Sequence, residues 1–110
     1  MSDMYVLDER GEPKRCNDVE RWAQWFAKDE RRAVRKNTFR VNEHEVTVST
    51  VFLGMDHNWS RQRWPILWET MIFGLDGDDQ PQWRYSSRDD AIRNHERLVD
   101  ELLTTGSYQT

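Results

Sequence analysis

The chain of 110 residues has the length of a single domain, which we place at residues 1–110. Its six Trp, four Phe and three Tyr are too many aromatic residues for a disordered segment, and a formal net charge of -4 at pH 7 argues against non-specific binding to nucleic acid. A single cysteine (Cys16), no signal peptide at the start of the chain and no apolar run near the ~20 residues of a membrane helix predict a cytoplasmic protein without a membrane segment.

The first third of the chain predicts a strand followed by a helix. The apolar run Met4–Leu7 is typical of an edge strand, and residues 12–16 are predicted as a connector. Asn17 is placed to cap the following helix, with Glu20 as its capping-box partner. The predicted buried face of this helix is an apolar stripe flanked by Trp25 and formed by Val19, Trp22, Ala23, Phe26 and Ala27.

Three strands are predicted in the middle of the chain. Residues 31–41 combine basic and apolar side chains, which indicates a strand with a solvated basic side. Such basic groups either contact phosphate or protect an exposed strand edge against aggregation. After a turn at residues 42–45, Val46–Leu53 and Ile66–Phe73 carry apolar groups on both alternating faces, so we expect both to be central strands.

The last third predicts a loop at residues 75–81, a short strand at Gln82–Tyr85 and a final helix. Ser86 or Ser87 can cap that helix. Its apolar stripe, interrupted only by a histidine, consists of Ala91, Ile92, His95, Leu98, Val99 and Leu102. The order β-α-β-β-β-β-α favours an α+β two-layer sandwich, a mainly antiparallel sheet with both helices on one face.

Several motifs resemble those of a family of small phage and bacterial proteins. The similarity spans nearly the whole chain, and its motifs are S-T-V-F-L-G-M-D-H, P-I-L-W-E-T-M-I-F-G and W-R-Y-S-S, preceded by Y-V-L-D-E-R-G-E-P and W-A-Q-W-F. The resemblance implies a phage or mobile-element origin. It implies no catalytic residues, because the family has no established mechanism.

Four polar residues of the central region are candidates for a site. Glu69 lies in a predicted central strand on an otherwise apolar face, and His95 interrupts the apolar stripe of the last helix. If Glu69 faces the helices, the two side chains can form a structural pair, and a Glu–Arg pair is the other structural solution. Asp56 and His57 follow the preceding strand, and a metal site built from these histidines and carboxylates is the functional alternative, although the spacing matches no metal motif.

The connection between the two central strands is the other candidate. Asp56 can cap the turn after Gly54 by accepting backbone amides, or it can contact a ligand together with His57. The polar segment that follows alternates aromatic and guanidinium groups, which are enriched at binding hot spots: Trp59, Arg61 and Trp64. A loop with its tryptophans folded onto the sheet is the competing interpretation.

The preferred hypothesis is a small phage-type accessory protein that binds without catalysis, as a host-protein inhibitor, an anti-defence factor or a sequestering agent for a small ligand. The alternative is a small metal-assisted hydrolase that uses Asp56, His57, Glu69 and His95. No nucleotide-binding or nucleophile motif is present, and we expect no cofactor. Apolar groups on the sheet face away from the helices predict a homodimer.

Overall fold

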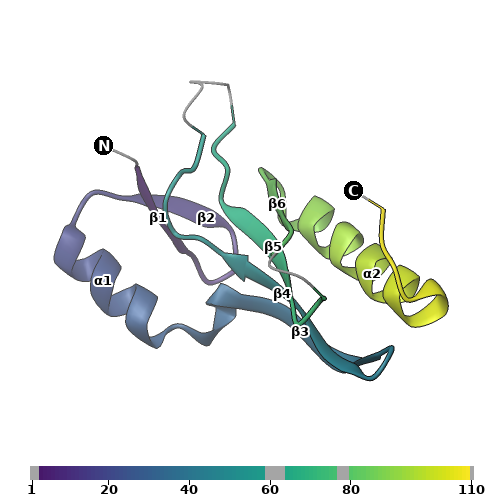
Figure 1. Ribbon diagram of the computed structural model, residues 1–110. Helices are drawn as coiled ribbons and strands as arrows, with labels where there is room; N and C mark the ends of the chain where they lie inside the picture. Colours follow the sequence, from purple (N-terminus) through teal and green to yellow (C-terminus); the bar gives the residue numbers. More distant parts are fainter. Residues whose placement is uncertain (1–2, 59–63, 77–79, 110) are drawn as a thin grey trace.

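The computed structural model describes residues 3–58, 64–76 and 80–109 (Figure 1). It contains two antiparallel sheets and two α-helices, and therefore confirms the predicted α+β class with a mainly antiparallel sheet. The larger sheet has four strands in the order β3 (Ala33–Val41), β4 (His44–Phe52), β5 (Trp68–Phe73) and β6 (Gln82–Tyr85). No helix in the described part of the chain is long and apolar enough to cross a membrane.

The smaller sheet corrects one prediction. The expected connector at residues 12–16 contains strand β2 (Pro13–Cys16), which pairs with β1 (Met4–Leu7). The hairpin forms because Asp8 Oδ1 accepts the backbone amides of Arg10 and Glu12, each at 2.9 Å, and thereby closes the turn. Because Lys14 and Arg15 are exposed, β2 lacks the alternation that identifies a strand in the sequence.

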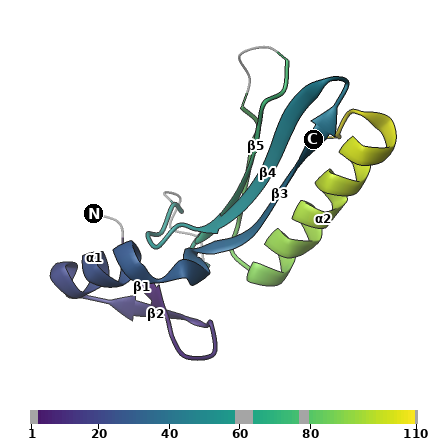
Figure 2. The ribbon, with the colours of Figure 1, turned by 90° about the horizontal axis from the view of Figure 1, so that it is seen from below.

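The two helices pack on different partners (Figure 2). Helix α2 (Arg88–Thr105) lies along one face of the four-stranded sheet and contacts all four of its strands. Helix α1 (Val19–Lys28) instead contacts β1 and β2, at the other end of the molecule, and a 3-10 turn at Glu30–Arg32 leads from it into β3. Both helices were predicted on one face of a single sheet, whereas the structure has one helix packed on each sheet.

Helix α1 is less buried than its stripe predicted. None of its residues is fully buried, and Val19 is 64% exposed. Its contacts come from the half-buried Trp22, Trp25 and Phe26, because the small hairpin cannot cover a whole helix face. The N-cap is Asp18, which accepts the amide of Arg21, and not the expected Asn17.

Helix α2 matches its predicted ends. The Ser87 hydroxyl accepts the amide of Asp90, and Gly106 ends the helix in the left-handed conformation with φ 75°. The turn between β3 and β4 is shorter than the turn predicted at residues 42–45. Only Asn42 and Glu43 form it, both with positive φ, and His44 already pairs with Val41.

Two groups of buried residues hold the elements together. The first group joins α2 to the sheet and contains Val41, Val46, Val48, Ile72, Leu98 and Leu102. The second group contains Leu7, Phe52, Leu67, Trp68 and Ala91. Trp25 packs edge-on against Phe52 and so connects α1 to this second group. The hairpin, α1, the sheet and the start of α2 therefore meet in one place.

Candidate functional site

Glu69 and His95 lie on opposite faces of the four-stranded sheet. His95 reaches the sheet from α2 through Thr50, whose hydroxyl lies 2.6 Å from that of Thr70. Successive residues of a strand point to opposite faces, so Glu69, next to Thr70, points away from α2. Its Oε2 accepts a hydrogen bond of 2.9 Å from Nε of Arg84, the residue opposite it on β6. The expected Glu69–His95 pair is not formed, and the Glu–Arg solution is present.

His95 belongs to a buried polar network that is fully hydrogen-bonded at the imidazole. Its Nε2 lies 2.7 Å from Oδ1 of Asn37, which can only accept, so Nε2 carries the proton. Its Nδ1 then accepts from the Thr50 hydroxyl at 2.7 Å. Burial, together with the smaller effect of the nearby Arg35, lowers the pKa of His95 to about 4. A neutral imidazole with both nitrogens bonded in the core is a structural group.

Asp56 and His57 close the neck of the connection between β4 and β5. Oδ1 of Asp56 accepts the amides of Asn58 at 2.8 Å and Ile66 at 2.9 Å. The amide of His57 donates to the carbonyl of Ile66, and its Nδ1 donates to the carbonyl of Met55. The capping role predicted for Asp56 is therefore present, and it holds together two ends of chain that are ten residues apart.

The predicted metal-site residues are not assembled. Glu69 and His95 face opposite sides of the sheet, whereas Asp56 and His57 form the neck of a loop. Within residues 3–58, 64–76 and 80–109, no group of three or more His, Cys, Asp or Glu side chains could hold a metal ion. Trp59 and Arg61 lie outside the described residues.

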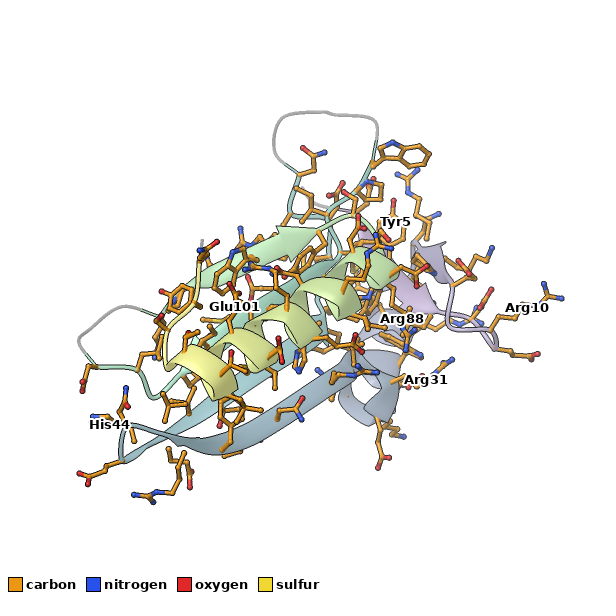
Figure 3. All side chains as sticks on the ribbon, turned by 90° about the vertical axis from the view of Figure 1, so that its right-hand side faces the viewer. Tyr5, Arg10, Arg31, His44, Arg88 and Glu101 are labelled. Atoms are coloured by element: carbon orange, nitrogen blue, oxygen red, sulfur yellow. The ribbon has the colours of Figure 1, made fainter. Side chains whose placement is uncertain are left out.

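Trp64 is the predicted site residue that the structure places at a cleft. It is 66% exposed, the largest exposure among the large apolar side chains in the described part of the chain. The cleft, which we call the hairpin–helix cleft, measures about 860 Å³ and lies between the β1–β2 hairpin and the start of α2. Figure 3 shows three of its residues, Tyr5, Arg10 and Arg88, at the same end of the molecule.

Aromatic and apolar groups form part of the cleft wall. Trp64 and Pro65 stand on one side, and Leu67 and Trp68 continue the wall into the second buried group. Trp68 is only 3% exposed, and its Nε1 has no hydrogen-bond partner among the described residues. An indole N–H that is buried without an acceptor is uncommon, because its desolvation is not compensated.

Three arginines line the same cleft, and they differ in how they are held. The guanidinium of Arg31 donates to the carbonyls of Leu7 and Asp8 and pairs with Asp29 at 2.6 Å, so it fixes the hairpin to α1. That hydrogen-bonded pair holds the pKa of the Asp29 carboxyl at about 2. The guanidinium groups of Arg10 and Arg88 form no hydrogen bond or ion pair with any residue that the structure describes.

Carboxylates are also present in the cleft. Glu9 and Glu12 come from the hairpin turn, and Asp89 comes from the first turn of α2. The lining therefore presents both signs of charge beside an aromatic wall. Such a surface suits a protein segment that carries polar and apolar groups together, because protein interfaces combine an apolar centre with a polar rim.

A second cleft, of about 770 Å³, lies at the other end of α2. It is lined by the β3–β4 turn, residues 74–76 and residues 106–109, and it contains an exposed pair between His44 Nε2 and Asp76 Oδ1 at 3.0 Å. The described residues around it include no unpaired arginine and no tryptophan. It therefore has fewer of the residue types that dominate binding energy at interfaces than the hairpin–helix cleft has.

The sequence alone did not identify Arg10, Arg88 or Tyr5 as site residues. They come from a hairpin turn, a helix start and an edge strand, which only the tertiary fold brings together. The one usable signal was the concentration of Trp and Arg in the chain, and it pointed only to the Trp64 side of the cleft.

Comparison with known proteins adds no functional assignment. No protein-family model, no curated protein and no solved structure matches the chain. The function is therefore inferred from the residues that line the clefts and faces of the molecule.

Proposed function

We propose that this chain is a small phage-type accessory protein that binds a host protein without catalysis, through the hairpin–helix cleft. The observation that carries this proposal is the exposed Trp64 at a cleft that also presents the unpaired guanidiniums of Arg10 and Arg88. Tryptophan and arginine are the residue types that most often dominate binding energy at protein interfaces.

The energetics favour coverage of this surface. A tryptophan that is two-thirds exposed leaves apolar area in water, and burying apolar area contributes about 25 cal/mol per Å². The two guanidiniums can each donate two hydrogen bonds to a planar carboxylate without first breaking an existing pair. A partner segment that inserts an apolar side chain next to Trp64 and places a carboxylate near Arg88 would satisfy both requirements.

Inhibition of a host protein and interference with a host defence system are the two modes of action that this binding supports. A small ligand is the competing occupant of the same cleft, and the protein would then act by sequestering it. The cleft volume falls within the range of small-molecule sites. We propose that the protein acts in the cytoplasm of the bacterial host. Nucleic acid is not proposed as a partner, because the net charge of -4 opposes it.

Capture from a host lysate tests the proposal. The immobilised protein should retain a defined host protein, and Trp64→Ala and Arg88→Ala should each reduce its recovery at least tenfold. Leu103→Ala, which removes another apolar side chain with 60% exposure, and Lys28→Ala, which removes another exposed charge, are the matched controls and should capture normally. Equal capture by Trp64→Ala and Leu103→Ala would contradict the proposal.

A ligand panel separates the two occupants. Small metabolites, including nucleotides, should not raise the melting temperature, since a molecule that binds only the native state stabilises it. A rise of several degrees with one metabolite, abolished by Trp64→Ala, would assign the cleft to sequestration and not to a host protein.

We also propose a homodimer through the sheet face that α2 does not cover. Val51, Met71 and Phe73 lie on this face, and Phe73 is 37% exposed. Multi-angle light scattering should give twice the chain mass of 13.3 kDa, and Phe73→Lys should return the protein to a monomer. A monomer at every concentration would contradict this part of the proposal.

A further inference from the structure

Strand β3 is an open edge of the four-stranded sheet. It pairs with β4 on one side only, and Figure 1 shows no element of the fold beyond its other side. Among the described residues, no backbone group of residues 34–41 forms a hydrogen bond outside the ladder with β4. After an irregularity between Ala33 and Arg35, the register runs without a break from Arg35 to Val41. The edge therefore offers a regular row of unpaired N–H and C=O groups.

The hairpin register shows which residues present those groups. Val41 and His44 flank a two-residue turn, so they form a hydrogen-bonded pair, and bonded pairs alternate along an antiparallel ladder. The backbone groups of Lys36, Thr38 and Arg40 consequently point away from β4. The Thr38 hydroxyl lies 2.9 Å from that of Thr47, on the sheet face opposite α2.

The side chains of this row are basic. Strand β3 has the sequence A-V-R-K-N-T-F-R-V and contains no acidic residue. Lys36 forms no ion pair with any residue that the structure describes, and the guanidinium of Arg40 is bonded to the carbonyl of Glu43 only. Arg35, by contrast, points to the α2 side and is paired with Glu96. Two cationic side chains thus stand four residues apart beside the unpaired backbone row.

We propose that the β3 edge binds an extended acidic segment of a partner protein, which adds antiparallel to the sheet as a fifth strand. The partner's residue opposite Thr38 would exchange both backbone hydrogen bonds with it. Acidic residues two positions before and two positions after that residue would then face Arg40 and Lys36 on the same side of the sheet. The recognised pattern is an acidic residue at i and at i+4 in an extended segment, which is strand addition with charge specificity.

Charge excludes a second copy of this chain as the added strand. In the two-fold register centred on Thr38, Lys36 of each copy lies against Arg40 of the other copy, and like charges directly opposite each other are destabilising. In every other register the second β3 still contributes no carboxylate. The edge therefore complements a different protein.

A designed nine-residue peptide tests the pattern. It carries glutamate at positions 3 and 7, threonine at position 5 and valine between them, and a fluorescent label reports binding by anisotropy. We expect it to bind about tenfold more tightly than the same peptide with lysine at positions 3 and 7. A peptide with glutamate at positions 3 and 6 keeps the charge but places the two carboxylates on opposite faces, and it should bind as weakly as the lysine peptide.

Two changes test the two components of recognition separately. Lys36→Glu combined with Arg40→Glu should reverse the peptide preference, so that the lysine peptide binds better. The control, Lys14→Glu combined with Lys28→Glu, changes the net charge equally and should leave the peptide preference unchanged. N-methylation of the peptide's threonine amide removes the donor to Thr38 and should abolish binding.

Three outcomes would overturn the inference. Binding that follows charge but not spacing would reduce it to diffuse electrostatics, and unchanged binding of the N-methylated peptide would exclude strand addition. No binding by any peptide would show that Lys36 and Arg40 only protect the edge from aggregation. Trp64→Ala should not change peptide binding, so this result is independent of the hairpin–helix cleft.

Discussion

His95 of α2 and Thr50 of β4 are joined by a hydrogen bond of 2.7 Å in the interior of the molecule, where His95 is 0% exposed. In the neutral imidazole, Nδ1 accepts the hydroxyl proton while Nε2 donates to Asn37. Protonation of Nδ1 would place a positive charge in a desolvated site. The fold is therefore more stable with His95 uncharged, because burying the charged ring costs free energy.

The first prediction is a loss of stability in mild acid. The folded-state pKa of His95 is about 4, below the unfolded value of 6.5, so between these pH values the unfolded chain binds more protons. The contribution of His95 is complete above pH 6.5 and decreases as the pH falls toward 4, by about 3 kcal/mol in total. Urea unfolding at pH 7, 6, 5 and 4.5 should show this decrease.

The control is His95→Gln, which keeps a polar side chain without the titrating ring. Its free energy of unfolding should be lower at pH 7 but should change much less between pH 7 and 4.5. An equally steep pH dependence in the variant would assign the effect to carboxylates. Asp29 keeps its stabilising contribution over this range and loses it only below about pH 4, because its pKa is held at about 2 in the fold against 3.8 in the unfolded chain.

The second prediction concerns Glu69 and Arg84 on the other sheet face. The Glu69 side chain is 11% exposed, so removing its partner leaves a nearly buried carboxylate without a charge-assisted hydrogen bond. Arg84→Ala should lower the free energy of unfolding by about 1–2 kcal/mol, a modest value because the Arg84 side chain is 38% exposed and screened by water. Chemical denaturation at pH 7 measures the change.

A double-mutant cycle isolates this interaction. Arg84→Ala together with Glu69→Gln should cost less than the sum of the two single changes, because the second change removes the unpaired charge that the first one leaves. Arg93→Ala breaks an exposed pair with Asp90 and should change stability by less than about 0.5 kcal/mol. Additive single changes would mean that Glu69 and Arg84 are not energetically coupled.

Why the sequence left the direction of Glu69 open can be stated in terms of strand geometry. Both alternating faces of the two central strands carry apolar residues, so hydrophobicity did not indicate which face α2 covers. The structure buries the face with Thr50 and Thr70, whose hydroxyls bond to each other and to His95. Because α2 covers the face that carries Thr70, the neighbouring Glu69 points to the opposite face, where it pairs with arginine and not with histidine.

Local signals were sufficient where a single residue type has one strong role. Ser87 and Gly106 end α2 as predicted, and Asp56 caps the neck of its loop. No comparable local signal marked β2 or the cleft. The two unpaired arginines of the cleft are Arg10 and Arg88, and their proximity depends on contacts between a hairpin and a helix that are remote in the chain.

The third prediction concerns Gly54, where α1 meets the end of β4. Its φ is +76°, and an added Cβ would lie 2.9 Å from two ring carbons of Phe26. Trp22 Nε1 also donates to the Gly54 carbonyl at 2.9 Å, so the backbone position is fixed from two sides. Gly54→Ala should lower the free energy of unfolding through backbone strain and displacement of Phe26.

Gly11 provides the matched control. Its φ of +80° is nearly the same, but an added Cβ would meet no heavy atom within 4 Å. Gly11→Ala therefore reports the backbone strain alone, about 1 kcal/mol, and Gly54→Ala should exceed it by at least ~1 kcal/mol. Equal losses of stability would mean that Phe26 can move aside without cost.

The fourth prediction links Asp56 to the hairpin–helix cleft. Its Oδ1 holds the amides of Asn58 and Ile66, and the chain leaves Ile66 toward Trp64 and Pro65 on one side and Leu67 on the other, all three of which line the cleft. Asp56→Ala should lower the free energy of unfolding by about 1–2 kcal/mol, because two half-buried amides lose their acceptor. It should also weaken capture of a host partner, since the wall that carries Trp64 is no longer held at the neck.

Asp56→Asn separates the hydrogen bonds from the charge. The asparagine keeps an oxygen that can accept the same amides, so it should retain most of the stability and normal capture. Asp76→Ala removes a carboxylate that is 85% exposed near the other cleft and should leave both measurements unchanged. If Asp56→Ala lost stability but captured normally, the neck would serve the fold alone, and the position of Trp64 would have to depend on its own contacts at the cleft.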